Sequence, residues 1–141
     1  MEKAECARLQ SYLRTLFGSP ALSVAASGDD EAELRMGETV LGNIIKDLDE
    51  GELSYCLSMG MARGPGRAKN APLDEAERGR VETQLRQRIE SLGLTVRPRP
   101  RKTDSAEVYV GDEFIGTLSV DEDEGYFLTV SILDIDLEDA G

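Results

Sequence analysis

Apolar residues recur along this chain with the period of an α-helix in two separate stretches. The first stretch has Leu9, Leu13, Leu16 and Phe17, and the second has Val81, Leu85, Ile89 and Leu92. Residues three or four positions apart lie on one face of a helix, so both stretches predict an amphipathic helix. A glycine follows each stretch, at Gly18 and Gly93, and a left-handed residue there commonly ends a helix.

The segments after each helix alternate between apolar and polar residues over short runs, which is the pattern of β-strands. The runs expected to form strands are 21–24, 52–59, 94–98, 107–120 and 126–137. Within 107–120, Gly111 precedes Asp112, as Gly37 precedes Glu38 in the first half. Glycine at the first central position favours a type II′ turn, so each half is predicted to contain a tight hairpin.

The two halves of the chain carry the same design. When the chain is shifted by 74 residues, "EAELRMGETVLG" (31–42) falls on "SAEVYVGDEFIG" (105–116) without a gap. The coinciding glycines are Gly37 with Gly111, Gly42 with Gly116, and Gly51 with Gly125. Such self-similarity indicates an internal repeat. The sequence therefore predicts a first repeat at 1–60, a Gly/Pro-rich basic linker at 61–72, and a second repeat at 73–141.

Each repeat is predicted to be a helix followed by an antiparallel β-meander of about four strands, which makes the fold class α+β. A regular two-residue hairpin would put Val108 and Ile115 on one face of the sheet, and Tyr109, Phe114 and Leu118 on the other. Both faces are then too apolar for open solvent, and a unit of this size buries little surface alone. We therefore expect the repeats to pack as a pseudo-twofold pair within a monomeric chain, with two tethered independent units as the alternative.

Three segments resemble a known family. They are "VRPRPRKTDSAEVYVGDEFIG" (96–116), "ILDIDLE" (132–138) and the first helix, "ARLQSYLRTLFGSPALSV" (7–24). They are similar to a small bacterial family catalogued as domain of unknown function 3126. The resemblance implies that this chain is a tandem duplication of one family unit. It implies no catalytic residues, and the first half lacks the Arg/Pro segment.

Charge and composition narrow the classes of function. The chain of 141 residues has a formal net charge of −12, no histidine, and two cysteines, Cys6 and Cys56. Without histidine, the Ser-His-Asp and Cys-His systems and histidine-ligated zinc are excluded. The negative charge disfavours a general nucleic-acid surface, because phosphates are repelled. We expect no disulfide framework, no signal peptide and no membrane span, and a cytoplasmic location.

A basic strip is the strongest candidate contact. It contains Arg97, Arg99, Arg101 and Lys102, with Pro98 and Pro100 between them. Proline is confined to the edges of sheets, so the strip is predicted to be an edge strand or an extended arm. It could protect that edge while pairing with the protein's own acids. It could instead contact an acidic partner protein or a nucleic acid.

Acidic residues supply the remaining candidates. The turns 47–51 and 121–125 gather carboxylates beside a glycine, but their spacing differs from that of a calcium-binding EF-hand loop. We expect solvated hairpin tips and no metal site, with divalent-cation binding as a third interpretation. Asp134 and Asp136 are expected on the outward-facing side of the last strand, where a partner could contact them.

These observations predict a non-enzymatic, acidic protein-interaction module or accessory piece of a larger assembly. It would use no cofactor and have no catalytic residues, because no acid–base or nucleophile pairing is visible. The predicted partner contacts are Arg97, Arg99, Arg101, Lys102, Asp134 and Asp136, and the partner is expected to be another protein. The alternative function is nucleic-acid or nucleotide binding through the Arg97–Lys102 strip.

Overall fold

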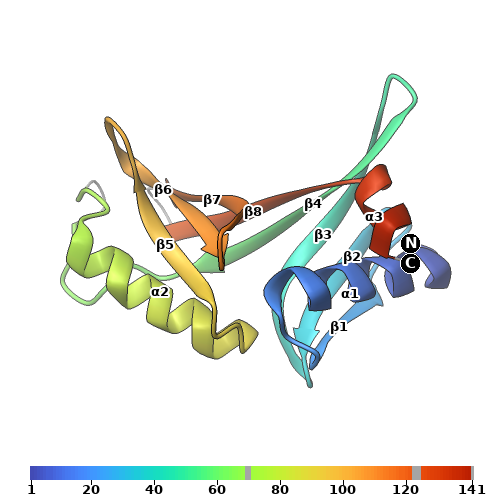
Figure 1. Cartoon of the computed structure of the whole chain (residues 1–141), viewed down its shortest axis with the longest axis horizontal. Coiled ribbons are helices and arrows are strands. Elements are labelled where there is room, and N and C mark those ends of the chain that lie inside the picture. Colours follow the sequence, from blue (N-terminus) through green and yellow to red (C-terminus); the bar gives the residue numbers. More distant parts are fainter. Residues whose placement is uncertain (69–70, 122–124, 141) are drawn as a thin grey trace.

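The computed structural model contains one eight-stranded antiparallel sheet with its two long helices against one face (Figure 1). It describes residues 1–68, 71–121 and 125–140. The helices are α1 (Lys3–Phe17), α2 (Glu75–Ile89) and α3 (Asp134–Ala140). The strands are β1 (Leu22–Ala26), β2 (Glu31–Met36), β3 (Thr39–Asp49), β4 (Glu52–Met61), β5 (Leu94–Arg99), β6 (Lys102–Val110), β7 (Glu113–Asp121) and β8 (Gly125–Leu133). The predicted α+β class is confirmed.

Local signals set the ends of the long helices. The first is preceded by a capping box between Glu2 and Glu5, and Gly18 follows it with a φ of 65°. The second begins after Asp74, whose carboxylate accepts a hydrogen bond from the backbone N–H of Glu77 at 2.9 Å. It ends earlier than predicted, because Glu90 takes the left-handed conformation with a φ of 56°. Leu92 therefore lies outside the helix and is 88% exposed.

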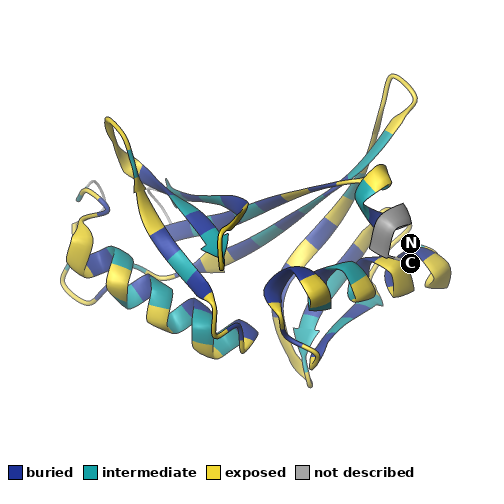
Figure 2. Cartoon of the chain, in the orientation of Figure 1, coloured by how far each residue is buried: buried dark blue, intermediate teal, exposed yellow. Residues whose placement is uncertain are grey.

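The face of the sheet under the helices is apolar, and the opposite face is mixed, with polar residues beside the exposed Ile45 and Phe114. Buried and less buried residues alternate along the strands (Figure 2). The buried positions of the two central strands are Tyr55, Leu57, Met59, Met61, Tyr126, Leu128, Val130 and Ile132. The residues between them are Ser58, Thr129 and Ser131, together with Cys56, Gly60 and Phe127. The side of the sheet away from the helices therefore has a solvent-compatible surface.

A β-bulge creates this division and overturns the regular hairpin register predicted from the sequence. Tyr109 pairs with Phe114 as expected, but Val108 pairs with Gly116, so Ile115 is the extra residue. An extra residue on one strand moves all later side chains to the other face. Leu118 consequently pairs with Ala106 on the helix side. The predicted second apolar face therefore does not form.

The two halves of the chain join edge to edge through β4 and β8. The strand order is β1-β2-β3-β4-β8-β7-β6-β5, so both central strands come from the ends of their meanders. Leu57 pairs with Val130, and Met59 pairs with Leu128, in one antiparallel ladder. The C-terminal ends of the long helices also meet, because the Ser91 hydroxyl donates to the carbonyl of Phe17 at 2.5 Å.

The strand registers show which residues correspond between the halves. Leu22 and Leu94 pair with Met36 and Val110 in matching places. In the hairpins that follow, Ile44 pairs with Leu57, and Leu118 pairs with Leu128. Tyr55 therefore corresponds to Tyr126, and Gly60 corresponds to Ser131. The constant shift of 74 residues still relates β3 to β7 but no longer relates β4 to β8, so Gly51 and Gly125 are not equivalent.

The last strand is shorter than predicted. Strand β8 ends at Leu133, and Asp134 begins α3, so the prediction that Asp134 and Asp136 alternate along a strand is wrong. The Asp136 carboxylate accepts a hydrogen bond from the backbone N–H of Leu133 at 3.0 Å, which favours the turn into a helix. The α3 helix then packs beside α1 and buries Leu137.

Side chains from the long helices cover part of both free sheet edges. At the first edge, the Gln10 side-chain oxygen accepts from the backbone N–H of Val24 at 3.0 Å, and Arg14 donates to the carbonyl of Leu22 at 2.6 Å. The second edge repeats the arrangement with Glu82 to Val96 and Arg86 to Leu94, at 2.8 and 2.7 Å. These bonds occupy backbone groups that could otherwise pair with another strand.

The close approach of strands at Gly116 gives a stability test. A Cβ atom at this position would lie 2.4 Å from the carbonyl oxygen of Thr129. Gly116→Ala is therefore expected to lower the free energy of unfolding by about 1–3 kcal/mol, measured by chemical denaturation. Gly79→Ala is the matched control, because that Cβ would meet nothing within 4 Å. The control is expected to stabilise α2 by up to about 1 kcal/mol. Equal stabilities for the two variants would contradict the packing at Gly116.

Candidate binding surfaces

The basic strip lies at the sheet edge, as the prolines predicted. Arg97 is on the helix-free face, with its guanidinium 4.0 Å from the centre of the Tyr109 ring. It also donates to the carbonyl of Gly111 at 3.0 Å. Tyr109 in turn meets Phe114 edge to face, at a ring separation of 5.7 Å. Arg97 is therefore held over the Tyr109 ring, and Phe114 remains 50% exposed.

The rest of the strip forms the tip of the β5–β6 hairpin, which projects from the body of the molecule (Figure 1). We call Arg99, Arg101 and Lys102 the basic arm. Arg99 donates to the Ser105 hydroxyl at 3.1 Å, while Arg101 and Lys102 are exposed. Within the described parts of the chain, no ion pair joins these three residues to an acid. Among the described residues, the basic arm therefore shows no pairing with the protein's own acids.

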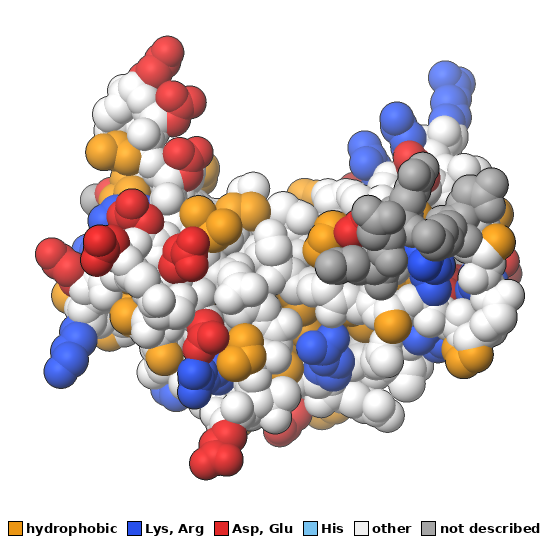
Figure 3. All heavy atoms as spheres, turned by 180° about the vertical axis from the view of Figure 1, so that it is seen from behind, with side chains coloured by type: hydrophobic (Ala, Val, Ile, Leu, Met, Phe, Trp, Pro, Cys, Tyr) orange, Lys and Arg blue, Asp and Glu red, His pale blue; other side chains and the backbone are white. Residues whose placement is uncertain are grey.

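A second arm of opposite charge projects on the other side of the molecule. It is the long β3–β4 hairpin, whose tip carries Asp47, Asp49, Glu50 and Glu52, all exposed. Figure 3 shows acidic side chains gathered on this arm and basic side chains on the other. The overall charge of −12 is therefore unevenly spread, and the basic arm is separated from the acidic one.

Asp134 and Asp136 are placed apart from the basic strip. They lie in the first turn of α3, beside α1, whereas β5 lies at the far edge of the sheet (Figure 1). Asp136 lines a groove of about 380 Å³ together with Tyr12, Leu16, Glu113, Phe114, Ile115, Gly116, Thr117, Thr129 and Ser131. The predicted site residues thus divide between two surfaces, and Asp136 belongs to the second.

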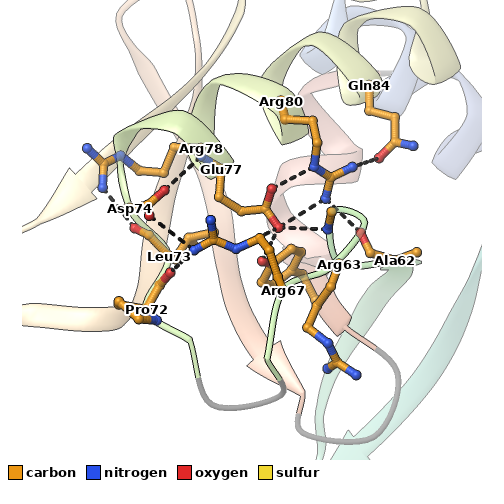
Figure 4. A network of polar contacts seen from close by, with 12 residues as sticks. Ala62, Arg63, Arg67, Pro72, Leu73, Asp74, Glu77, Arg78, Arg80 and Gln84 are labelled. Carbon is orange, nitrogen blue, oxygen red and sulfur yellow. Dashed lines mark hydrogen bonds and ion pairs between the residues drawn. The ribbon is translucent and has the colours of Figure 1, made fainter.

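A buried carboxylate organises the segment between the repeats (Figure 4). Glu77 is 3% exposed and accepts from the hydroxyl of Tyr126, the guanidinium of Arg80 at 2.6 Å, and the backbone N–H of Gly64 at 2.9 Å. Burial alone raises the pKa of Glu77, but the hydrogen bonds from Arg80 and Tyr126 outweigh it and lower the pKa to about 2. Glu77 is therefore an ionised anchor, poorly suited to acid–base work at neutral pH.

Two arginines of the predicted linker take part in this anchoring. Arg67 pairs with Asp74 at 3.1 Å and donates to the carbonyl of Pro72 at 2.7 Å. Arg63 donates to the carbonyl of Asp121 at 3.1 Å. Both arginines are therefore bonded to the protein itself.

The first half has a corresponding anchor at Glu5. Its carboxylate accepts from the hydroxyl of Tyr55 and pairs with Lys46, both at 2.8 Å. Burial raises the pKa of Glu5, and the bonds from Lys46 and Tyr55 lower it to about 2 overall. Each half thus uses one glutamate on its helix and one tyrosine on its last strand to fix the helix on the sheet.

Sequence reasoning missed these anchors and the groove. Glu5 and Glu77 lie on the apolar faces of the two predicted helices, and that position was the available signal. Tyr55 and Tyr126 are 71 residues apart, so the uniform shift of 74 did not align them. The groove combines residues from α1, α3, β7 and β8. No sequence motif joins them.

Two further expectations concern metals and membranes. In the described ranges, no three acidic, cysteine or histidine side chains are grouped to hold a metal ion. The acidic turn at 121–125 includes residues 122–124, which lie outside those ranges. The helices in the described chain are each too short or too polar to span a bilayer.

The chain belongs to the family described as "Protein of unknown function (DUF3126)". The family matches twice, over residues 5–62 and 77–136. The two matches confirm the tandem duplication, and each covers one long helix together with its strands. Comparisons with curated proteins and with solved structures gave no match.

The anchors predict acid sensitivity. The pKa of Glu77 falls from 4.5 to about 2 on folding, so its contribution to stability is present above pH 4.5 and is lost as the pH falls toward 2. By proton linkage the loss amounts to about 3 kcal/mol, and Glu5 is expected to behave in the same way. Denaturant unfolding between pH 7 and pH 2 measures it. A free energy of unfolding that stays constant over this range would contradict the anchor.

Tyr126→Phe tests the anchor at one atom. Removing the hydroxyl takes a donor from a buried carboxylate, so we expect a loss of about 1–3 kcal/mol at pH 7 and a weaker dependence on acid. Tyr109→Phe removes a hydroxyl from the half-buried ring that stacks on Arg97, and it serves as the control. An equal effect of the two substitutions would show that Tyr126 contributes only packing.

Proposed function

We propose that this protein is a non-enzymatic interaction module whose basic arm contacts an acidic segment of another protein. The observation that carries the proposal is the exposed Arg101–Lys102 tip, which has no acidic partner in the described chain. Exposed charges left without internal partners are available for an electrostatic contact with another molecule. Arg97 supports the arm from its base, where the Tyr109 ring fixes its guanidinium.

We further propose that the two repeats form a fused pseudo-twofold pair, each unit being a helix followed by a four-stranded meander. In the β4–β8 ladder, Ser58 pairs with Thr129, which is its own counterpart in the other half. Leu57 pairs with Val130, and the corresponding Met59 and Leu128 also pair. A surface that contacts its own counterpart is what a twofold interface requires.

This arrangement supports a single chain as the working unit. The strand edges that a separate repeat would use for dimerisation are already paired between β4 and β8. The outer edges are partly occupied by helix side chains. We propose a monomer that works in the cytoplasm, where its two unpaired cysteines would remain reduced.

Nucleic-acid binding is the alternative function. The exposed Phe114 and the Arg97–Tyr109 stack favour it, because aromatic and guanidinium planes stack on bases. The acidic β3–β4 arm and the net charge of −12 oppose it, because both repel phosphates. The same charges repel an acidic protein segment less, because such a segment is less densely charged than a nucleic-acid backbone with its charge at every phosphate.

Site-specific crosslinking tests the proposal. The full chain would carry a photoreactive amino acid in place of Lys102, or in place of Arg8 on α1 as a control. Both versions would be irradiated in cell extract with and without nuclease. We expect a discrete protein crosslinked only from position 102, insensitive to nuclease, and at least fivefold reduced when Arg99 and Arg101 are changed to Glu.

The matched charge control is Lys3→Glu with Arg8→Glu, which makes the same change in net charge on α1 and should leave the crosslink intact. Crosslinks of equal yield from both positions would overturn the basic arm as the contact. Recovery of nucleic acid instead, with affinity falling steeply as salt rises, would establish the alternative.

A further inference from the structure

The groove beside α1 has walls of mixed chemistry. Tyr12 and Leu16 come from α1, Asp136 from α3, and Glu113 and Phe114 from the start of β7. Its lining includes two carboxylates, two aromatic rings and no basic side chain. A concave site that combines apolar surface with a few converging polar groups is typical of binding pockets.

The base of the groove lies where β7 and β8 approach each other closely. Gly116 has no side chain, and the carbonyl of Thr129 lies so close that a Cβ atom would come within 2.4 Å of it. The bulge at Ile115 breaks the regular ladder at the same place. The groove therefore lies next to the bulge and the glycine that fix the sheet register.

The equivalent place between α2 and β4 shows what can fill such a groove. Leu16 on α1 corresponds to Arg88 on α2, and Ser131 on β8 corresponds to Gly60 on β4. The Arg88 guanidinium donates to the carbonyl of Gly60 at 3.1 Å, so an arginine crosses from the helix of one half to the central strand of the other. Between α1 and β8 the corresponding helix residue is leucine, and the groove remains.

The electrostatics of the groove favour the same chemical group. Burial raises the pKa of Tyr12, and the charges of Asp136 and Glu113 raise it further. Both carboxylates therefore act on the space around the Tyr12 ring. A guanidinium can stack on aromatic faces and bond to a carboxylate with two N–H groups, which an ammonium cannot do.

We propose that this groove binds an arginine side chain of a partner protein. The two carboxylates supply the counter-charge, Tyr12 and Phe114 contact the planar guanidinium, and Leu16 and Ile115 contact the aliphatic stem. The site is independent of the basic arm, has the opposite charge, and lies beside α3 rather than at the β5 edge. A partner could use either surface without the other.

The probe is N-acetyl-arginine N-methylamide, titrated into the ¹⁵N-labelled full chain and followed by NMR. We expect saturable shifts of the backbone amides of Gly116, Thr117, Thr129 and Ser131. The neutral citrulline analogue, which has nearly the same shape, is expected to cause shifts at least fivefold smaller at the same concentration. Equal shifts from both compounds, or shifts confined to other surfaces, would overturn the proposal.

Two variants make the test specific. Leu16→Arg introduces at position 16 the residue found at the corresponding position 88. We expect its side chain to fill the groove and abolish binding. Glu113→Gln with Asp136→Asn removes both charges, keeps an acceptor for the Leu133 N–H, and should weaken binding about fivefold to tenfold. Asp47→Asn with Asp49→Asn makes the same charge change on the acidic arm and should leave binding unchanged.

The double variant decides the outcome if Leu16→Arg unfolds, which thermal melting would reveal. Undiminished binding by Glu113→Gln with Asp136→Asn would overturn the groove as the site. An equal loss in the Asp47→Asn with Asp49→Asn control would show that only net charge attracts the probe, and would overturn it too. If the groove does not bind the probe, the proposal for the basic arm still stands, because crosslinking from position 102 tests a different surface.

Discussion

The antiparallel pairing of β4 with β8 is the constraint on which the rest of this structure depends. Each meander would otherwise end in a strand with unpaired backbone groups, and a half of this size buries little apolar surface alone. The pairing makes one continuous core, in which Leu57 and Val130 are neighbours on adjacent strands. It also brings the ends of the long helices together, so that Ser91 reaches the carbonyl of Phe17.

Charged residues occur both at buried positions and on the two projecting arms. Glu5 and Glu77 are buried and ionised, and tyrosine hydroxyls and basic groups satisfy them. The β3–β4 arm is acidic, and the β5–β6 arm is basic. These internal anchors hold helices and the inter-repeat segment, so the charges on the arms are not required for the packing of the core. We therefore expect substitutions of the charged residues on the arms to leave the fold intact.

The sequence predicted the elements better than it predicted their association. Apolar spacing located both long helices, and Pro98 and Pro100 correctly placed β5 at an edge. The single-residue bulge at Ile115 could not be read from alternation, because Val108, Ile115 and Leu118 are all apolar. Missing it produced a false second apolar face, and with it the expectation that one repeat would cover the face of the other.

The candidate surfaces were predictable to different degrees. The basic strip was visible because four charged residues are close in sequence, while the groove joins side chains more than 100 residues apart, Tyr12 and Asp136. Asp134 and Asp136 were singled out for their charge, but their helix depends on the local bond between Asp136 and Leu133. Features formed by residues close in sequence could therefore be predicted, whereas contacts between residues distant in sequence could not.

Position 16 on α1 holds a leucine, whereas the corresponding position 88 on α2 holds an arginine. This difference has a consequence for the number of ligands that one chain can bind. A symmetric homodimer built from a single unit must present two identical grooves, both filled or both open. Fusion of the units in one chain removes that requirement, because each copy of a position can hold a different residue. In the proposed pseudo-twofold pair, Arg88 would occupy one of the two equivalent places and leave one open groove, so a ligand of that groove would be counted once per chain.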